Sequence, residues 1–502
     1  MAEAGPIRFY LDGQLHEVDN TNPFTTVLDY LRDVLGRRGS KEGCAEGDCG
    51  ACTVVLSEVH HGRLRYRAVN SCIQLVGSLD GKELLTVESL GKPGDLHPVQ
   101  QAMVEQHGSQ CGFCTPGIVM SLFALYKTEP IVSREQVDEC LSGNLCRCTG
   151  YRPIIDAALH ANALASSGDR LRELPSTDPC DEETHVVRAL ESIHSMQDKF
   201  FKGPAVDGAE QTLFVPKSLA SAVQLKGQYP DATIVAGCTE IGVWRNKAHR
   251  DFNVGISLNE ISELKEIQSN EDTLHIGAGA SLSDVWGVLV DEYPELDEMF
   301  YRFASPPVRN AATVAGNLAN ASPIGDLPPV LIALRASVEL LSERGSHEVP
   351  ADQFISDYRK SVLAPDEIIR SVKIPRRPSN LVLRAYKISR RFEQDISAVS
   401  SVFAYHVKGG LIEDANIAMG GVAATPLRLA DCEAALRGER LTTKVPPAAI
   451  EAMRASIRPL TDVRASERYR RQIAINLIRR FHVEIAADEP VRVHPRASGA
   501  RL

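Results

Sequence analysis

Between Lys41 and Val54 the chain reads KEGCAEGDCGACTV, with cysteines at positions 44, 49 and 52. A fourth cysteine follows twenty positions after Cys52. The spacing C-x4-C-x2-C with a distant fourth thiol is typical of the loop that holds a plant-type 2Fe–2S cluster. Three glycines in this loop allow positive φ angles and bring backbone N–H groups close to sulfur. The stretch therefore predicts a 2Fe–2S centre whose metal ligands are Cys44, Cys49, Cys52 and Cys72.

A second group of cysteines lies in the runs GSQCGFCTPG (108–117) and GNLCRCTGYRPI (143–154). Each pair directly precedes an expected helix, whose N-terminus carries partial positive charge and free N–H donors that stabilise thiolates. The sharp C-x-C turn is awkward for an ordinary zinc ribbon, so we predict a second 2Fe–2S cluster. Structural zinc is the alternative for both groups, but it usually takes two close pairs of cysteines. The predicted ligands of the second cluster are Cys111, Cys114, Cys146 and Cys148.

The flanking sequence predicts the elements that carry these loops. Alternating apolar residues around Asp12-Gly13 predict a β-hairpin, and TVLDYLRDVL (26–35) predicts a helix. Four short helices are expected between 98 and 165, with Thr115 as the N-cap of the second. Ser133 and Gln136 are spaced as a capping box at the start of the third. Four short helices predict a small bundle.

Composition limits the class of protein. The chain has 502 residues, a formal charge of −10 and a pI near 5.8, so we expect several domains and no nucleic-acid or membrane partner. No apolar run reaches the length of a membrane span, and the first residues do not resemble a signal peptide. Disulfides are not expected among the twelve cysteines, which predicts a reducing, cytoplasmic location. Cys140 and Cys180 are expected to bind no metal.

Two further stretches have the composition of a cofactor site. The strand pattern 233–236 followed by Gly237 would place backbone N–H groups together, which suits a pyrophosphate. The run FASPPVRNAATVAGNLANASPIGDL (303–327) is rich in small residues that let a large planar ligand approach. From composition alone, a packing loop is equally consistent with that run. A Rossmann fingerprint is excluded, because Leu282 stands where the third glycine would be.

The cysteine runs resemble the iron–sulfur domains of the molybdenum hydroxylases, the family of xanthine dehydrogenase and aldehyde oxidase. The segments TIVAGCTEIG (233–242), VAGNLANASPIGDLPPV (314–330) and YRKSVLAPDEII (358–369) resemble the FAD-binding segments of that family. The resemblance implies a multidomain α+β protein. Its expected parts are a ferredoxin-like β-grasp domain with one 2Fe–2S cluster (1–85), a four-helix 2Fe–2S bundle (86–165), a linker (166–210), an α/β FAD-binding domain of the PCMH type (211–378), an α+β C-terminal flavoprotein domain like that of CO dehydrogenase (379–485) and a tail (486–502).

The resemblance also implies individual cofactor contacts. The implied pyrophosphate loop is Ile234, Val235, Ala236, Gly237, Cys238, Thr239, Glu240 and Ile241. The implied flavin and ribityl contacts are Phe303, Thr313, Gly316, Asn317, Asp326, Ile369 and Lys387. Lys387 and Glu240 are the implied catalytic residues, and Tyr358, Glu240 and Asp395 are candidates for the nicotinamide side. Cys238, Asn320 and Gly325 replace the asparagine, threonine and serine common in the family, so only backbone contacts carry over there.

The order iron–sulfur then flavin resembles the small subunit of bacterial xanthine dehydrogenases. It implies that electrons pass from a molybdenum site through both clusters to FAD and then to NAD⁺, with oxygen as an alternative acceptor. The chain stops where single-chain members continue, which implies a large molybdopterin-binding partner in a heterotetramer of two small and two large chains. The alternatives are the equivalent subunit of another molybdenum hydroxylase, acting on an aldehyde or aromatic substrate, and a zinc-stabilised scaffold without activity.

Overall fold

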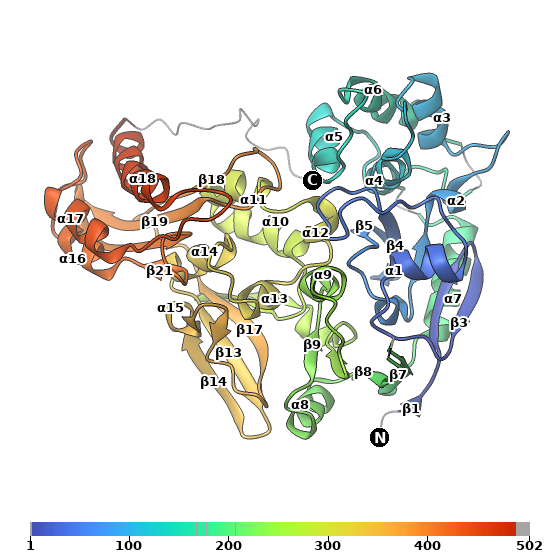
Figure 1. Cartoon of the computed structure of the whole chain (residues 1–502). Coiled ribbons are helices and arrows are strands. Elements are labelled where there is room, and N and C mark those ends of the chain that lie inside the picture. Colours follow the sequence, from blue (N-terminus) through green and yellow to red (C-terminus); the bar gives the residue numbers. More distant parts are fainter. Residues whose placement is uncertain (1–2, 167–168, 177, 206, 488–502) are drawn as a thin grey trace. The chain divides into compact units, whose positions relative to one another are not determined.

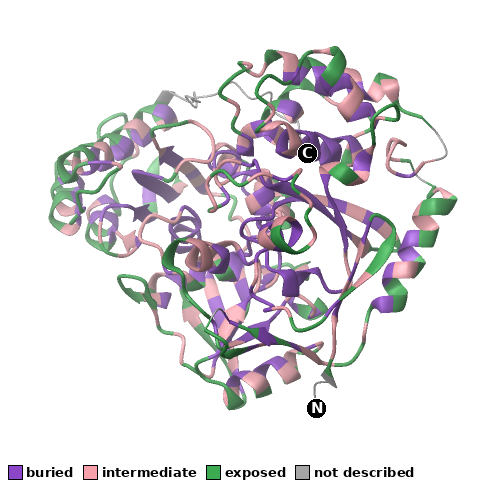
Figure 2. Ribbon diagram, turned by 45° about the vertical axis from the view of Figure 1, so that its right-hand side comes forward, coloured by how far each residue is buried: buried purple, intermediate pink, exposed green. Residues whose placement is uncertain are grey.

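A computed structural model describes residues 3–166, 169–176, 178–205 and 207–487 (Figure 1). The chain forms two compact units. Unit 1 comprises residues 1–225, 231–262 and 305–312, and unit 2 comprises 226–230, 263–304 and 313–502. The strands inside each unit are mostly buried, whereas the helices keep an exposed face (Figure 2). The segment expected to form one FAD-binding domain therefore contributes to both units.

The N-terminal part of unit 1 is a five-stranded sheet of order β3-β2-β6-β4-β5. Its strands are β2 (Ile7–Leu11), β3 (Gln14–Val18), β4 (Thr53–His60), β5 (Arg63–Asn70) and β6 (Glu83–Leu85). The predicted hairpin is confirmed: Leu11 pairs with Gln14, and Asp12 and Gly13 both have positive φ. The predicted helix at 26–35 is short, because α1 (Val27–Asp29) continues as a π-helical turn, in which the N–H of Leu35 bonds Tyr30 O.

The second part of unit 1 is helical and has its own buried core. Its helices are α2 (Val87–Leu90), α3 (Pro98–Glu105), α4 (Thr115–Thr128), α5 (Arg134–Cys140) and α6 (Arg152–Ala161). The capping box of Ser133 and Gln136 is confirmed. The N-cap predicted at Thr115 is wrong: Cys114 takes that position, and the Thr115 hydroxyl bonds Ser109 Oγ at 2.7 Å.

The segment expected to be a linker contains regular secondary structure. Helix α7 (Asp181–Ile193) and strand β7 (Lys199–Pro204) lie within it. Val186 and Leu190 of α7 are buried in the core of the helical part. Arg170, upstream of α7, is 5% exposed and forms an ion pair with Glu83, which is fully buried. Low apolar content hid this segment because a few well-spaced apolar residues are enough to dock a short helix.

A second sheet of unit 1 has the order β1-β7-β8-β10-β9. It adds β1 (Glu3–Ala4), β8 (Glu210–Val215), β9 (Thr233–Val235) and β10 (Val254–Ser257), and β8, β10 and β9 run parallel. Helices α8 (Leu219–Gln228), α9 (Thr239–Ala248) and α12 (Pro306–Arg309) accompany it. One hydrophobic core joins this sheet to the β-grasp sheet, since Phe24 and Leu75 share it with Val235 and Phe252.

Unit 2 contains an antiparallel sheet of order β11-β12-β17-β13-β14. Its strands are β11 (Ile267–Ser269), β12 (Thr273–Gly277), β13 (Ser337–Ser342), β14 (Gly345–Pro350) and β17 (Ile368–Pro375). Its helices are α10 (Leu282–Glu292), α11 (Asp297–Tyr301), α13 (Val314–Ala319), α14 (Leu327–Ala333) and α15 (Ala351–Phe354). A small hairpin, β15 (Ile355–Asp357) and β16 (Lys360–Ser361), follows α15.

The last part of unit 2 is a sheet of order β18-β19-β20-β21 with three helices. The strands are β18 (Leu381–Ile388), β19 (Val399–Lys408), β20 (Leu411–Gly420) and β21 (Leu427–Arg428). The helices are α16 (Ala430–Leu436), α17 (Pro447–Ser456) and α18 (Glu467–Ala487). A hairpin turn joins β19 to β20, and Gly409 and Gly410 in that turn both have positive φ. The predicted tail lies outside the described residues from 488 onward.

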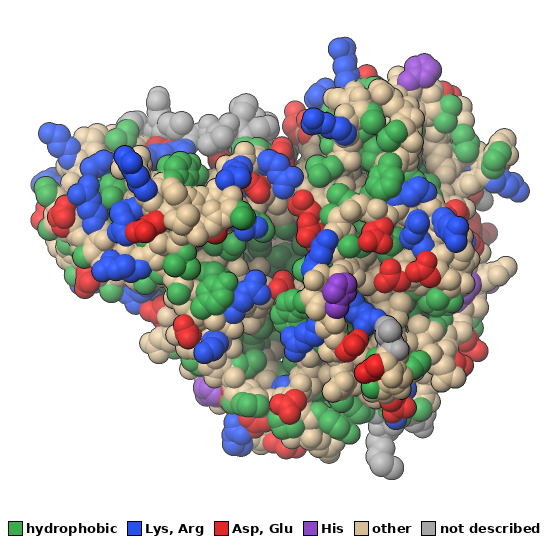
Figure 3. Space-filling view, in the orientation of Figure 1, with side chains coloured by type: hydrophobic (Ala, Val, Ile, Leu, Met, Phe, Trp, Pro, Cys, Tyr) green, Lys and Arg blue, Asp and Glu red, His purple; other side chains and the backbone are tan. Residues whose placement is uncertain are grey.

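Charge is unevenly distributed along this acidic chain. Lys and Arg side chains gather over α16 and α17 in Figure 3, where Arg437, Arg440, Lys444 and Arg454 are exposed. Among the described helices, none combines the length and the apolar character needed to cross a membrane. The multidomain α+β architecture predicted from the sequence is confirmed by the sheets and helices of both units.

Candidate functional site

The first four cysteines lie together in unit 1, although Cys72 is remote in sequence. Cys44 is within side-chain hydrogen-bonding reach of Cys49 and of Cys72, and Cys72 is within reach of Cys52. Cys52 and Cys72 are buried, and Cys44 and Cys49 are partly exposed. The structure thus brings together all four ligands predicted for the first cluster.

Backbone donors converge on the sulfur of Cys44. The N–H groups of Asp48 and Cys49 lie 3.2 and 3.3 Å from Cys44 Sγ, and the N–H of Glu46 is also within hydrogen-bonding reach of it. A Cβ added at Gly43 would lie 2.8 Å from Cys49 Sγ, so the loop leaves space for sulfur only because glycine stands there. Converging N–H donors and a loop with no room for side chains fit an anionic iron–sulfide cluster.

The second four cysteines form two pairs near the surface of unit 1. Cys111 is within hydrogen-bonding reach of Cys148, and Cys114 is within reach of Cys146. Cys111 and Cys148 are exposed, whereas Cys114 is the residue at the start of α4. The hydroxyl of Tyr151 accepts a hydrogen bond from the N–H of Cys146 at 2.8 Å, which fixes the C-x-C turn.

Pairs of thiols suit a two-iron cluster, in which each iron takes two cysteines. The two thiol pairs of the second group and the backbone donors of the first group therefore fit the ligands of 2Fe–2S clusters.

The two cysteine groups meet at a backbone seam. The N–H of Leu145, the residue before Cys146, donates to the carbonyl of Cys49 at 2.9 Å. A Cβ added at Gly117 of α4 would lie only 2.0 Å from Gly50 O, so the helix touches the first loop directly. A single hydrogen bond therefore links the main chain of Cys49 in the first group to that of Leu145, next to Cys146 in the second group.

The two remaining cysteines of this region have other surroundings. Cys140 on α5 donates its thiol to Ser121 O at 3.2 Å, and burial raises the pKa of this thiol to about 12. Cys180 directly precedes α7, and burial raises the pKa of its thiol.

The predicted pyrophosphate loop of unit 1 runs from β9 into α9. A Cβ at Gly237 would lie 2.0 Å from Ala311 O, so only glycine fits there. Cys238 has a φ of +63° and leads into α9. Its side chain is buried in the core shared with the β-grasp sheet, where burial raises the pKa of the thiol to about 11. Cys238 can therefore offer a ligand its backbone N–H but not its side chain.

The predicted flavin contacts belong to unit 2. Thr313 caps α13 and accepts the N–H of Gly316 at 3.0 Å. Asn317 follows, and its buried Oδ1 has no hydrogen-bond partner among the described residues. An unsatisfied buried amide oxygen in a small-residue segment is a natural partner for a ligand donor. Ile369 on β17 is 5% exposed, and Phe303 is partly exposed.

Lys387 is held in a buried network of unit 2. It is 3% exposed, forms an ion pair with Asp326 and donates to Ser397 Oγ at 3.1 Å. Ser397 in turn donates to Asp326 Oδ1 at 2.5 Å. The predicted contacts Asp326 and Lys387 therefore neutralise each other, so the pair can present hydrogen bonds without a net charge.

The nicotinamide-side candidates lie in exposed or partly exposed positions. Tyr358 is 51% exposed at the turn between β15 and β16. Asp395 accepts the N–H groups of Arg390 and Arg391 at 2.8 and 2.9 Å, so it holds a turn. Glu240, in the first turn of α9, belongs to unit 1. Asn320 is the C-cap of α13, and the N–H of Gly325 bonds Ser322 O at 3.3 Å.

Arg302 was missed by the sequence reasoning. Its buried guanidinium donates to Lys387 O at 2.7 Å, to Phe392 O at 3.1 Å and to Ser389 Oγ at 3.0 Å. It also lies over the ring of Phe392, 4.7 Å from the centroid. Arg302 therefore fixes the loop after Lys387. The only local signal was its place next to Phe303.

Comparison with known protein families gives four matches in order along the chain. Residues 9–76 match a 2Fe-2S iron-sulfur cluster binding domain, and 86–159 match a [2Fe-2S] binding domain. Residues 208–377 match the FAD binding domain in molybdopterin dehydrogenase, and 384–485 match the CO dehydrogenase flavoprotein C-terminal domain. The chain therefore belongs to the molybdenum hydroxylase family of oxidoreductases, with two 2Fe–2S domains and an FAD-binding domain as its cofactor-binding parts.

Curated relatives agree with this assignment. The chain is 33% identical to a xanthine dehydrogenase of Emericella nidulans, over 97% of this chain and 39% of the relative. It is 34% identical to a xanthine dehydrogenase of Oryza sativa subsp. japonica, over 87% of this chain and 36% of the relative. The chain thus spans less than two fifths of the length of these relatives.

Solved structures match about half of this chain. A chain of carbon monoxide dehydrogenase from Hydrogenophaga pseudoflava is 29% identical with a TM-score of 0.51, over 53% of this chain and 94% of that chain. Quinoline 2-oxidoreductase from Pseudomonas putida 86 is 24% identical with a TM-score of 0.51, over 55% of this chain and 96% of that chain. The second match shows a shared fold.

Proposed function

We propose that this chain carries electrons in a xanthine dehydrogenase, from a molybdenum site through two 2Fe–2S clusters to FAD and on to NAD⁺. The observation that carries the proposal is the seam between the cysteine groups, where Leu145 N–H donates to Cys49 O at 2.9 Å. Electron transfer between one-electron centres needs short, well-ordered contacts of this kind. The name that these relatives carry, xanthine dehydrogenase, supports the proposed substrate.

Residue roles follow from the site. The first cluster takes Cys44, Cys49, Cys52 and Cys72, and the second takes Cys111, Cys114, Cys146 and Cys148. FAD supplies the conversion between single-electron and two-electron chemistry when bound. We assign backbone N–H groups of 234–241 to its pyrophosphate, and Phe303, Thr313, Gly316, Asn317, Asp326, Ile369 and Lys387 to the flavin side. Lys387 and Glu240 remain the proposed catalytic residues, with Tyr358 and Asp395 toward the nicotinamide.

A partner chain that holds molybdopterin is part of the proposal. The carbon monoxide dehydrogenase match covers 94% of that chain and 53% of this one, so about half of this chain has a counterpart that is a separate chain. A heterotetramer of two small and two large chains in the cytoplasm is the assembly that we propose. The match to carbon monoxide dehydrogenase also favours, as second candidate, the same role in a molybdenum hydroxylase with another substrate.

The test is metal and flavin analysis of the natively purified protein, followed by reduction with NADH. We expect about four irons and one FAD per chain, a molybdopterin-containing partner that co-purifies, and bleaching of the visible absorption by NADH and by xanthine. A colourless protein with bound zinc would contradict the electron-transfer role. Bleaching by NADH but not by xanthine would favour the second candidate, with aldehydes and aromatic heterocycles as the next substrates to assay.

A further inference from the structure

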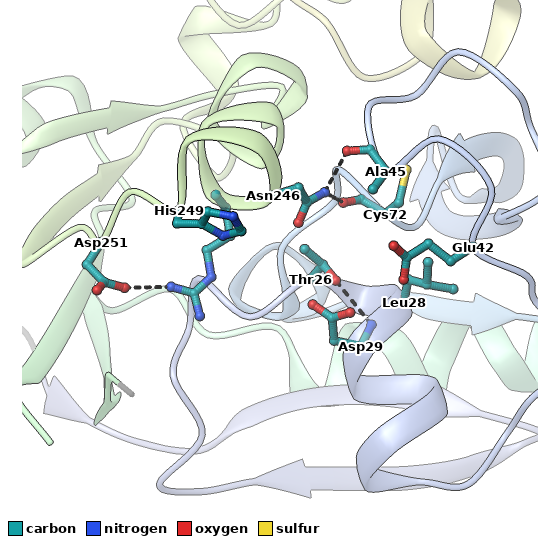
Figure 4. Close-up of a pocket in the computed structure, with 10 residues that line it drawn as sticks. Thr26, Leu28, Asp29, Glu42, Ala45, Cys72, Asn246, His249 and Asp251 are labelled. Atoms are coloured by element: carbon teal, nitrogen blue, oxygen red, sulfur yellow. Dashed lines mark hydrogen bonds and ion pairs between the residues drawn. The ribbon is translucent and has the colours of Figure 1, made fainter. Parts of the chain in front are cut away.

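A side-chain amide on helix α9 of unit 1 reaches into the first cysteine group. Asn246, on α9, donates from Nδ2 to Ala45 O at 2.9 Å and to Cys72 O at 2.7 Å (Figure 4). Ala45 directly follows the proposed ligand Cys44, and Cys72 is itself a proposed ligand. An amide nitrogen has two N–H donors, and Asn246 directs one to each carbonyl. It therefore ties together the two parts of the site that are remote in sequence.

The peptide after Ala45 connects Asn246 to a sulfur. Its carbonyl accepts the Asn246 amide, and its N–H, which belongs to Glu46, is within hydrogen-bonding reach of Cys44 Sγ. In a trans peptide the two groups point in opposite directions, so amide, peptide and sulfur form a chain of aligned dipoles. Hydrogen bonds in series polarise one another, and Asn246 should therefore strengthen the bond from Glu46 to sulfur.

Ala45 needs an external restraint. Its φ is +55°, a left-handed conformation that costs a residue with a Cβ on the order of 1 kcal/mol. The hydrogen bond to its carbonyl is one contact that holds it there. Without Asn246, Ala45 could relax toward ordinary angles, and the N–H of Glu46 would turn away from sulfur.

Helix α9 is fixed against the same site. A Cβ at Gly242 would lie 2.5 Å from Ile73 Cα, so the helix touches the main chain just after Cys72. Val243 packs against the small core of Cys52 and Cys72. Beside them a cavity of about 490 Å³, which Asn246 and Glu42 help to line, brings solvent close to the site. The amide of Asn246 is therefore a pre-positioned dipole at a wet edge of the site.

We propose that Asn246 is a positioning residue that raises the reduction potential of the first 2Fe–2S cluster. The inference rests on the proposed ligand set of that cluster. Reduction adds negative charge to the cluster, and N–H donors to its sulfurs stabilise the reduced state, which raises the potential. Loss of the amide should lower the potential of the first cluster and leave that of the second unchanged. A carboxylate at 246 should lower it further, because it repels both carbonyls.

The test is a redox titration of the intact iron–sulfur flavoprotein, followed by electron paramagnetic resonance, with Asn246→Ala and Asn246→Asp. The second cluster is the internal reference. At a fixed potential we expect the ratio of reduced to oxidised first cluster to fall about threefold to tenfold in Asn246→Ala, where tenfold corresponds to about 59 mV for one electron. The matched control is Asn310→Ala, which removes a comparable amide bond, to Ala68 O at 2.9 Å, and should leave the ratio unchanged.

Each result of these titrations either supports or overturns the proposal. An unchanged first-cluster potential in both variants of Asn246 overturns the proposal, as does an equal shift in Asn310→Ala. If Asn246→Ala loses iron, a loss confined to the first cluster supports it, and an equal loss from both clusters overturns it. The nearly isosteric Asn246→Asp then supplies the potential. A wild-type protein without two clusters would instead refute the proposed function, so the two failures are distinguishable.

Discussion

The two cysteine groups have four thiols each and differ in their surroundings. In the first, Cys52 and Cys72 are 1% and 2% exposed, and α9 closes the site from outside the β-grasp sheet. In the second, Cys111 and Cys148 are exposed beside the ends of helices. Similar ligands therefore have unequal protection from water. Because solvent access and hydrogen bonds to sulfur both tune a cluster, the two centres should differ in potential and in resistance to iron loss.

The largest effect should come from removing one proposed cysteine ligand from either cysteine group. Cys72→Ser and Cys148→Ser should each lower the iron content from about four to about two per chain, because each leaves one cluster incomplete. Cys72→Ser should also lower the thermal unfolding temperature more, since Cys72 lies in a core and Cys148 does not. Metal analysis and thermal unfolding measure both. Cys140→Ser is the control and should keep all the iron, and an equal loss of iron there would refute the ligand assignment.

The next largest effect should come from breaking the buried ion pair between Arg170 and Glu83, in the β-grasp part that also holds the first cysteine group. Glu83→Gln leaves the Arg170 guanidinium buried without its charge partner, which should cost about 3 kcal/mol in the free energy of unfolding. Urea denaturation followed by fluorescence measures this change. Glu182→Gln removes a second, half-exposed carboxylate from the same arginine at 3.4 Å and should cost less than about 1 kcal/mol. Equal costs would show that burial does not decide the strength of this pair.

Acid should destabilise the helical part, which holds the second cysteine group, because His97 becomes protonated. Burial lowers the pKa of His97 to about 4 from its ordinary value of 6.5. Between these values the unfolded chain binds more protons than the folded chain, so the free energy of unfolding falls as the pH falls. The loss should reach up to about 3 kcal/mol at pH 4. Urea titrations from pH 7 to 4 measure it. His97→Asn keeps a helix cap and removes the titration, so parallel pH profiles for the variant and the wild type would contradict the prediction.

The smallest effect should come from a single helix cap in the bundle. Ser133→Ala removes the bond from Ser133 Oγ to the N–H of Gln136, at 3.2 Å, which should cost about 1 kcal/mol. Amide hydrogen exchange in α5 measures the local loss. Ser133→Asn retains an N-cap acceptor and should restore most of the protection. Identical exchange rates in the alanine variant would mean that packing alone holds α5.

Local patterns in the sequence predicted much of this molecule because they depend on neighbours in the chain. The loop around Cys44 and the hairpins at Gly13 and Gly409 need glycines at particular positions, and such requirements are visible in sequence. The cap at Ser133 is equally local. Thr115 failed as a cap because the cysteine pair before it continues directly into the helix.

Contacts between remote segments were not predictable in the same way. Asn246 bonds residues that are 174 and 201 positions away, and no pattern on α9 marks it. Arg302 and Arg170 resemble surface residues in sequence, and only tertiary structure shows that they are buried. The orientation of Cys238 depends likewise on a core assembled from two sheets.

The core that joins Phe24 and Leu75 to Val235 and Phe252 has a consequence for modularity. The boundaries of the matched family domains suggest that each domain could be exchanged between enzymes independently of the others. Here a fragment ending near residue 165 would expose the ring of Phe24, which packs against Phe252 and lies next to Gly255 of β10. Recombination between relatives should therefore succeed where residues 1–262 all come from one parent. The two sheets that share this core should accordingly have been inherited together and not exchanged separately.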